Sequence, residues 1–460
     1  MDPGHAEYAI DAIGLQQRNN GASAGFIGRH ARDCILRYTH THEPIRVPVS
    51  PSQTRTGRRP YGGRTRFSDR TMNRPMSIKR GRNFLLSPGP TNIPDRVLRA
   101  MQRPAIELHS DELIGLARSC LDDLKPIFRT REGKTFIYAA NGHGAWEAAL
   151  SNSLSPGDRV LVFETGVFGE AWAGMGQSRG LAPEFISGDW RHGIDAQVLE
   201  DRLRGDKKHA LKAILMVQTD TATGITSDVA VVRQAIDNAA HPALFMVDAV
   251  ASLAATDLRM DEWKVDVAVG ASQKALMSPP GLAFVAASPK ALECAQKATL
   301  PRHYWDWARR LDPEAYMWFC GTAPEHLLFA LREAINMIQE EGLENIFRRH
   351  QRLAGAVRAG INVWAEAGAL ELNALVPREQ SNSVSTIRVD ERYNATAIRE
   401  TCEKQLNTSL GGGLGRLSGK AFRIGHMGDI NEPMMLGALG SVELALEICG
   451  IPHGKGSVTA

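Results

Sequence analysis

The sequence has few cysteines, and it lacks both metal-ligand spacings and long apolar runs. Six cysteines occur among 460 residues, and none forms a Cys-x-x-Cys pair. This pattern argues against a disulfide framework or a structural zinc site and is typical of a reducing compartment such as the cytoplasm. The histidines are not spaced as metal ligands either. No apolar run approaches the roughly 20 residues that a membrane-spanning helix requires.

Charge is distributed unevenly along the chain. The net charge is +3, but residues 1–82 carry 15 Lys and Arg against 6 Asp and Glu. This segment therefore stands at +9 and the rest of the chain at −6. A mildly acidic body argues against nucleic-acid binding. The composition is otherwise that of an ordinary globular protein, and the length fits a two-domain α/β enzyme.

Residues 1 to about 80 differ from the remainder. The stretch from Pro48 to Arg66 is rich in Pro, Gly, Ser and Arg without apolar periodicity, which predicts disorder. Three interpretations stay open: a basic tail, an Arg-rich organellar presequence, or upstream sequence translated from a misassigned start. Met72 and Met76 precede the first folded-looking residues and favour the third, and acidic residues near the start weigh against a presequence.

From Asn83 onward short apolar runs alternate with helical segments. This alternation predicts a mostly parallel sheet with helices on both faces, in a large domain over residues 83–325. The predicted strands are 135–139, 160–164, 213–218, 243–248, 265–270 and 282–286, and the predicted helices include 145–153 and 228–239. A smaller α+β domain is predicted over 326–460, with helices at 326–341 and 434–449 and a strand at 384–389.

Lys274 indicates the chemistry most directly. It stands between an apolar segment and a Ser-Pro-Pro-Gly turn, where an ammonium group loses hydration and its pKa falls. A neutral amine is a nucleophile, and Asp248, at the end of an upstream strand, could hold a pyridine nitrogen protonated. Such a pair is what pyridoxal phosphate needs. A surface lysine and an N-cap aspartate are the simpler alternatives.

Other candidates follow predicted strands. The segment Asn141-Gly-His-Gly-Ala-Trp-Glu147 opens a helix whose first N–H groups could bind phosphate. Phe168 could stack on an aromatic ring, although core packing is commoner. The segment Thr219-Asp-Thr-Ala-Thr-Gly224 offers hydroxyl groups. Arg423 could bind a carboxylate with its bidentate fork or be a solvated arginine.

Taken in this order, these segments resemble the class V aminotransferases, above all their alanine/serine–glyoxylate branch. The resemblance runs from about Phe84 to about Pro452. Its most specific pieces are Ser87-Pro-Gly-Pro-Thr-Asn92, Val247-Asp-Ala-Val-Ala-Ser-Leu253, Ser272-Gln-Lys-Ala-Leu-Met-Ser-Pro-Pro-Gly281 and Phe422-Arg-Ile-Gly425. It implies a fold-type I architecture with a mostly parallel seven-stranded sheet. It also implies transfer of an amino group from serine or alanine, with aspartate as a further candidate, to glyoxylate.

The resemblance further implies a role for each site residue. Pyridoxal phosphate would be carried by Lys274, with Asp248 at its ring nitrogen and Arg423 binding the substrate carboxylate. The remaining cofactor contacts would come from Gly142, His143, Gly144, Phe168, Thr221 and Gln273. Pro88 and Gly89 would close over the substrate. Thr322 matches a threonine that reaches the cofactor phosphate of a partner subunit, which implies a homodimer with shared active sites.

The sequence departs from the family pattern near the expected pocket. Phe319 stands where some relatives have tyrosine, and Tyr304-Trp-Asp-Trp307 and Cys320-Gly321 also differ, which bears on donor preference. Ureidoglycine–glyoxylate and pyridoxamine–pyruvate transaminases stay open as alternatives, since few side chains decide specificity. A cysteine desulfurase is less favoured, because Gln273 rather than histidine precedes the lysine and Cys402 lies in a predicted helix.

Overall fold

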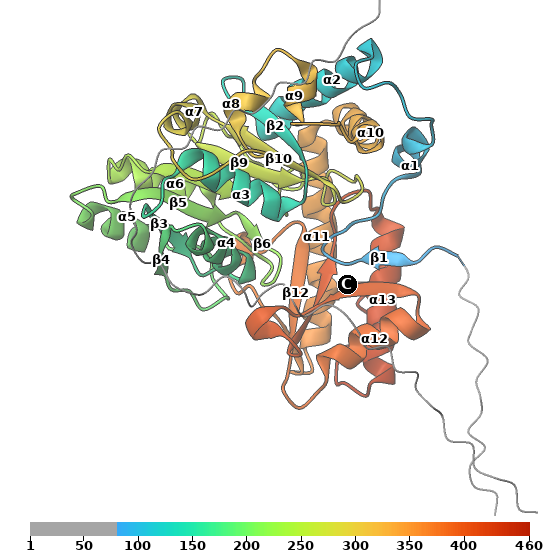
Figure 1. The fold of residues 1–460 in the computed structure, drawn as a ribbon. Coiled ribbons are helices and arrows are strands. Elements are labelled where there is room, and N and C mark those ends of the chain that lie inside the picture. The colour runs from blue at the N-terminus through green and yellow to red at the C-terminus, as the bar shows by residue number, and fades with distance from the viewer. Residues whose placement is uncertain (1–80) are drawn as a thin grey trace, which may run out of the picture. The chain divides into compact units, whose positions relative to one another are not determined.

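A computed structural model describes residues 81–460, and the predicted leader lies outside them. The described residues form a seven-stranded sheet between helices and a five-stranded sheet with its own helices (Figure 1). No helix in this part of the chain is long and apolar enough to cross a membrane.

The larger sheet has the strand order β2-β10-β9-β8-β5-β3-β4. Its strands are β2 (Lys134–Ala139), β3 (Arg159–Phe163), β4 (Ala182–Ile186), β5 (Leu211–Val217), β8 (Leu244–Asp248), β9 (Val267–Ala271) and β10 (Leu282–Ala287). Only β10 runs antiparallel to its neighbours, β9 and β2. The predicted seven-stranded, mostly parallel sheet is therefore confirmed.

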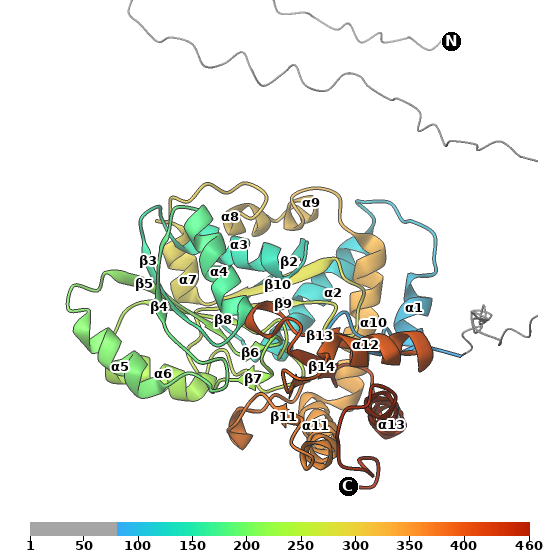
Figure 2. The same cartoon turned by 90° about the horizontal axis from the view of Figure 1, so that it is seen from below.

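Side chains alternate between the two faces of this sheet, and each face has its own core. Ile137 and Leu161 pack with the helices of one face, whereas Phe136 and Val160 pack with those of the other. Figure 2 shows the two helical layers. The first layer comprises α2 (Asp111–Phe128), α5 (Ala196–Gly205), α6 (Val229–Asn238) and α10 (Glu325–Glu341). The second comprises α3 (Gly142–Ser153), α4 (Val167–Ser178) and α7 (Pro289–Ala295).

All six predicted strands of the large domain overlap observed strands, with ends that agree within two residues. Strand β4 was not predicted. It lies at the sheet edge and includes Pro183, Glu184 and the half-exposed Phe185, so its burial is partial and its apolar pattern weak.

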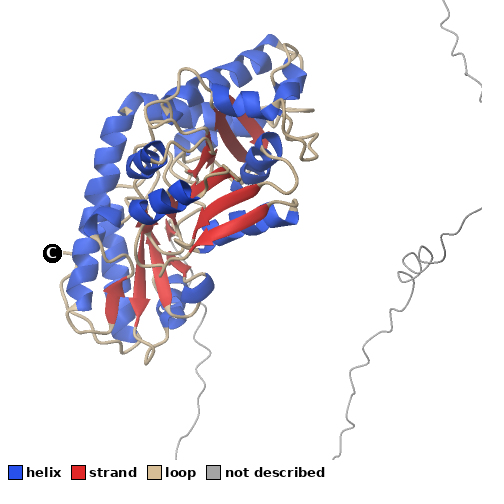
Figure 3. Cartoon of the chain, turned by 90° about the vertical axis from the view of Figure 1, so that its left-hand side faces the viewer, coloured by secondary structure: helices blue, strands red, loops and turns tan. Residues whose placement is uncertain are grey.

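The smaller sheet has the order β1-β13-β14-β12-β11. Its strands are β1 (Phe84–Leu86), β11 (Leu370–Leu372), β12 (Val384–Val389), β13 (Thr408–Gly412) and β14 (Ala421–Gly425). It is covered by α11 (Leu343–Ala365), α12 (Ala395–Gln405) and α13 (Glu432–Ile448), visible beside it in Figure 3.

Two segments differ from the predicted domain division. Strand β1 was assigned to the large domain but pairs in parallel with β13 of the smaller sheet. Helix α10 was assigned to the small domain, yet its residues Leu328 and Leu331 pack in the core of the larger sheet. Helix α11 contributes to both cores. Ile346 near its start packs in the core of the larger sheet, and Leu353 further along packs in the core of the smaller sheet. Both differences depend on contacts between distant parts of the chain.

The remaining elements are short. They are α1 (Asp95–Met101), α8 (Trp307–Arg310), α9 (Ala315–Trp318), the 3-10 turns η1 (Pro377–Glu379) and η2 (Gly415–Leu417), and a hairpin of β6 (Thr219–Asp220) and β7 (Ile225–Thr226). Most longer helices begin with a side-chain cap, such as Asn141 on α3 and Asp228 on α6. Helix α4 differs, because its N-cap residue is Gly166, which has no side chain.

Candidate active site

A cavity of about 170 Å³ opens at the carboxyl ends of the parallel strands, where α/β folds commonly bind ligands. It brings together seven predicted site residues: Gly142, His143, Phe168, Thr221, Asp248, Gln273 and Lys274. Asn141, Trp146, Thr219, Val250 and Ala251 complete its lining.

Asp248 is the last residue of β8 and is buried. Its Oδ1 accepts a hydrogen bond from the Val250 N–H at 2.7 Å, and its Oδ2 accepts one from Trp146 Nε1 at 3.0 Å. Burial nevertheless raises the pKa of Asp248 to about 7. A nearby cation would therefore strongly favour the ionised carboxylate.

Lys274 follows β9 by three residues. Burial lowers the pKa of its amine to about 8, the charge of Arg423 lowers it further, and Asp248 opposes the shift. The amine donates a hydrogen bond to the Pro88 carbonyl. A side chain on Gly89 would overlap Lys274, so the Pro88–Gly89 segment lies directly against the lysine.

Helix α3 begins at the cavity with Gly142, as expected. The N–H groups of His143 and Gly144 bond to the Asn141 side chain at 3.1 and 3.4 Å. Gly144 does not line the cavity, because its Cα faces Trp305, whose Cη2 would lie 2.9 Å from an added Cβ. The Gly142 N–H and the helix dipole remain as attractions for an anion.

Aromatic rings form one wall of the cavity. Phe168 lies on the first turn of α4, and its ring meets the edge of the Trp146 indole at 6.3 Å between centroids. The ring centroids of His143 and Trp146 lie 4.4 Å apart, and burial lowers the pKa of the His143 imidazole. The imidazole is therefore neutral near pH 7.

Arg423 reaches the site from β14 of the smaller sheet and is buried. Its Nε donates to the Gly412 carbonyl at 2.6 Å, and its Nη1 donates to the Thr221 carbonyl at 2.9 Å. Burial lowers its pKa to about 10, so it stays cationic at neutral pH. The two backbone contacts fix the guanidinium beside the cavity.

Thr322 lies elsewhere. It lines a second, largely apolar opening with Ile106, Leu108, Leu113 and Leu327. Within the single chain described here, Thr322 is not part of the Lys274 cavity. This position agrees with its predicted role only if it acts on another subunit.

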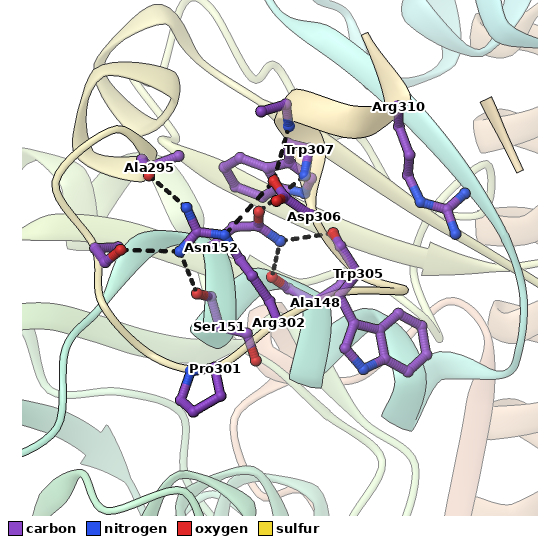
Figure 4. Close-up of polar contacts among 12 residues, drawn as sticks. Ala148, Ser151, Asn152, Ala295, Pro301, Arg302, Trp305, Asp306, Trp307 and Arg310 are labelled. Carbon is purple, nitrogen blue, oxygen red and sulfur yellow. Dashed lines mark hydrogen bonds and ion pairs between the residues drawn. The ribbon is translucent and has the colours of Figure 1, made fainter. Parts of the chain in front are cut away.

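The divergent segment Tyr304–Trp307 is tied to α3 (Figure 4). Asn152 Nδ2 donates to the carbonyls of Ala148 and Trp305, each at 2.8 Å, and its Oδ1 accepts from Trp307 N–H at 2.9 Å. Arg310 donates to the Tyr304 carbonyl and lies over the Tyr138 ring. The segment is thus bonded to the second half of α3, and none of its residues lines the cavity.

Pyridoxal phosphate fits the chemistry of these residues. The buried Asp248 carboxylate suits a cationic ring nitrogen, and the largely buried Lys274 supplies an amine of lowered pKa. Gln273 Oε1 is buried without a hydrogen-bond partner in the described chain, which leaves an acceptor for a ligand. Phe168 offers an aromatic face beside them.

Sequence reasoning missed two residues of the site. Trp146, which binds Asp248, lies within the segment identified as a phosphate loop, one helical turn after Gly142. Asp220 directly precedes Thr221 and is fully buried. Neither contact has a local sequence signal, since each joins segments that are far apart in the chain.

Comparisons with known proteins agree with this site. The family model for aminotransferase class-V matches residues 83–414. The chain is 40% identical over 378 residues to an L-aspartate–glyoxylate aminotransferase of Paracoccus denitrificans, covering 82% of this chain and 94% of the relative. It is 41% identical over 381 residues to a serine–glyoxylate aminotransferase of Arabidopsis thaliana, covering 83% and 94%.

Solved structures show the same fold. A ureidoglycine–glyoxylate aminotransferase from Bacillus subtilis superposes with a TM-score of 0.76 at 24% identity, covering 83% of this chain and 97% of that one. An alanine–glyoxylate aminotransferase from Nostoc sp. superposes with a TM-score of 0.73 at 27% identity, covering 80% and 97%. The chain therefore belongs to the class-V aminotransferase family, and it is a pyridoxal-phosphate-dependent aminotransferase.

Proposed function

We propose that this enzyme transfers the amino group of a small amino acid to glyoxylate, giving glycine and a 2-keto acid. Serine and alanine are the proposed donors, with aspartate as a third candidate. The observation that carries the proposal is the placement of Arg423 close to Lys274, beside the small cavity that Lys274 lines. Relatives named for serine, aspartate and alanine as donors all share glyoxylate as acceptor, which supports it.

Lys274 is proposed as the residue that carries the cofactor and moves the proton. When bound, pyridoxal phosphate supplies an electron-withdrawing ring that accepts the electron pair left at the substrate Cα. An amine with a pKa of about 8 is substantially neutral at mildly alkaline pH. Lys274 would take the Cα proton of the substrate and later return one, first as base and then as acid.

Asp248 and Arg423 are proposed to orient the reactants. The Asp248 carboxylate, fixed by Trp146 and Val250, holds the proton on the ring nitrogen. The Arg423 guanidinium binds the carboxylate that both amino and keto acids carry. Phe168 would pack on the ring, and Thr221, Gln273, Gly142 and His143 would surround the remaining cofactor atoms. Gly144, whose N–H bonds to Asn141, would support this turn from outside the cavity. Pro88 and Gly89 exclude water from above Lys274.

The main alternatives keep the same chemistry. A ureidoglycine–glyoxylate or a pyridoxamine–pyruvate transaminase would use the same Lys274 and Asp248. A cysteine desulfurase is less supported. Cys402 is buried in α12, and burial raises the pKa of its thiol to about 12, so it is neither mobile nor a ready nucleophile.

The deciding experiment is an absorption titration of the purified protein loaded with pyridoxal phosphate. Serine, alanine, aspartate, ureidoglycine, pyridoxamine and cysteine are added separately, and glyoxylate or pyruvate follows. We expect the visible band to bleach with a small amino acid and to return with glyoxylate while glycine forms. A band that recovers only with pyruvate, or cysteine yielding alanine and sulfide, would overturn the proposal.

The proposal includes a homodimer with shared active sites. The apolar opening around Thr322 supports it, because Thr322 cannot serve the Lys274 cavity of its own chain as described. Sedimentation analysis should give twice the monomer mass. The Thr322→Ala variant should weaken cofactor binding while leaving the dimer intact, and a monomeric active enzyme would contradict both points.

The absence of disulfides among the described cysteines is consistent with a cytoplasmic location.

A further inference from the structure

Helix α4 needs an N-terminal cap that its own sequence does not supply. Gly166 stands at the N-cap position and offers no side chain to the first N–H groups of the helix. These groups have no partner within a helix and must bond elsewhere. The first turn also carries Phe168, so whatever satisfies this terminus fixes the aromatic wall of the site.

The cap comes from the β6–β7 hairpin. Asp220 Oδ2 accepts a hydrogen bond from the Phe168 N–H at 2.8 Å, and the same carboxylate accepts from the Gly169 N–H. Its Oδ1 accepts from the Ala222 N–H at 2.9 Å. One buried side chain, remote in sequence, thus caps α4 and closes the hairpin turn.

Gly166 makes this approach possible. A Cβ at position 166 would overlap the Asp220 carboxylate. Its φ of 165° is extended backbone that any residue adopts, so strain does not account for the glycine. Because Gly166 has no side chain, the Asp220 carboxylate can approach the N-terminus of α4.

Asp220 also connects the smaller sheet to the site. Its carbonyl accepts from the Gly224 N–H at 2.9 Å, which closes the turn that contains Thr221. The Thr221 carbonyl in turn accepts from Arg423 Nη1. Burial raises the pKa of Asp220 to about 6, whereas its three backbone bonds and the charge of Arg423 favour the ionised form. Phe168, Thr221 and Arg423 therefore have one common anchor.

We infer that Asp220 is a positioning residue of this active site: by capping α4 from the hairpin it holds Phe168 against the cofactor ring and keeps Thr221 and Arg423 in register with it. This inference rests on the proposed function. It assigns Asp220 no contact with substrate or cofactor.

The test is the dissociation constant of pyridoxal phosphate, read by absorption without any substrate. In Asp220→Asn, an amide oriented either way turns its NH2 group toward a backbone N–H. We expect the dissociation constant to rise by a factor of about 5 to 30. Gly166→Ala displaces the Asp220 carboxylate but keeps its charge, so this variant should raise the dissociation constant as well. It provides a second test should Asp220→Asn fail to fold.

Asp228→Ala is the matched control. Asp228 caps α6 through bonds to the N–H groups of Ala230 and Val231, away from the cavity. Its removal should lower the melting temperature but leave cofactor binding unchanged. If Asp220→Asn also lowers only the melting temperature, the role of Asp220 is merely structural and the inference is wrong.

A double-mutant cycle shows whether Asp220 acts through Phe168. Asp220→Asn should raise the dissociation constant by a certain factor in the wild type. In a Phe168→Leu background we expect that factor to be less than half as large. Equal effects in both backgrounds would overturn the inference. Because no substrate is present, these outcomes are separate from the proposed function, which fails if wild-type enzyme forms no glycine from glyoxylate.

Discussion

Asp248 and Lys274 line the same cavity, and burial shifts their pKa values toward each other. Asp248 rises to about 7 and Lys274 falls to about 8, although the first is an acid and the second a base. Such opposed shifts are typical of functional sites in which titratable groups are buried together. Both residues were predicted from sequence, because each stands at or just after the end of an apolar strand in an α/β pattern.

At this scale the first prediction concerns Lys274. Lys274→Ala should lower kcat by at least about 10⁴-fold, because it removes both the covalent attachment and the base. Steady-state transamination with serine and glyoxylate measures this loss. Lys212→Ala, a change at an exposed lysine remote from the cavity, is the control and should leave kcat unchanged. Wild-type-like turnover in Lys274→Ala would refute the assignment.

The second prediction concerns Arg423. In Arg423→Lys a point charge replaces the fork that holds two backbone carbonyls and that we propose to bind the substrate carboxylate. We expect KM to rise about tenfold to a hundredfold for the amino acid and for glyoxylate alike. Arg416→Lys, at an exposed arginine bound to Glu164 and Glu170, should change neither. A rise for only one of the two substrates would contradict the shared carboxylate role.

At the scale of elements, the sequence pattern predicted what depends on local periodicity. Strands such as β5 and β8 were found because their apolar runs are continuous, as buried parallel strands require. Strand β4 was missed because it is half exposed. The residues of β1 and α10 were placed in the large and the small domain respectively, whereas each packs with the other sheet, because local sequence does not specify distant pairing partners. Trp146 and Asp220 were overlooked for the same reason.

The third prediction belongs to the junction of α3 with the Tyr304–Trp307 segment. Asn152→Asp is nearly isosteric, but it replaces the donor that binds the Ala148 and Trp305 carbonyls with a buried acceptor. We expect a loss of about 3 kcal/mol or more in the free energy of unfolding, measured by urea denaturation. Asn345→Asp, on the exposed start of α11, should cost little. A loss below about 1 kcal/mol would show that the junction contributes little.

For the whole molecule, two neutral histidines tie the segment after β14 to its surroundings. His350 of α11 accepts from the Gly428 N–H at 3.1 Å, and His426 bonds to the Asn382 carbonyl and to Ser385 Oγ, each at 3.0 Å. Burial lowers the pKa of His350 to about 4 and that of His426 to about 3. Both must therefore stay unprotonated in the folded protein.

The fourth prediction is the resulting pH dependence. The folded pKa values lie below the unfolded value of about 6.5, so stability is lost as the pH falls below 6.5. At about pH 5.5 each histidine should cost about 1.2 kcal/mol relative to neutral pH. The free energy of unfolding, measured with urea at both pH values, differs between them in the wild type. His350→Gln should reduce that difference by the contribution of one histidine.

Comparing variant with wild type cancels the opposite contributions of Asp248 and Asp220, whose raised pKa values stabilise the fold as the pH falls. An unchanged dependence in His350→Gln would mean that this histidine becomes protonated without unfolding.

The parallel pairing of β1 with β13 sets an order for synthesis on the ribosome. All strands of the larger sheet lie between Lys134 and Ala287, so this sheet can close while the chain is still emerging. Phe84–Leu86 leaves the ribosome early but must wait for Thr408–Leu410. Pro88 and Gly89, which follow β1, and Arg423 on β14 take their places only then. The nascent chain therefore contains Asp248 and Lys274 before the Pro88–Gly89 segment and Arg423 can take their places beside them.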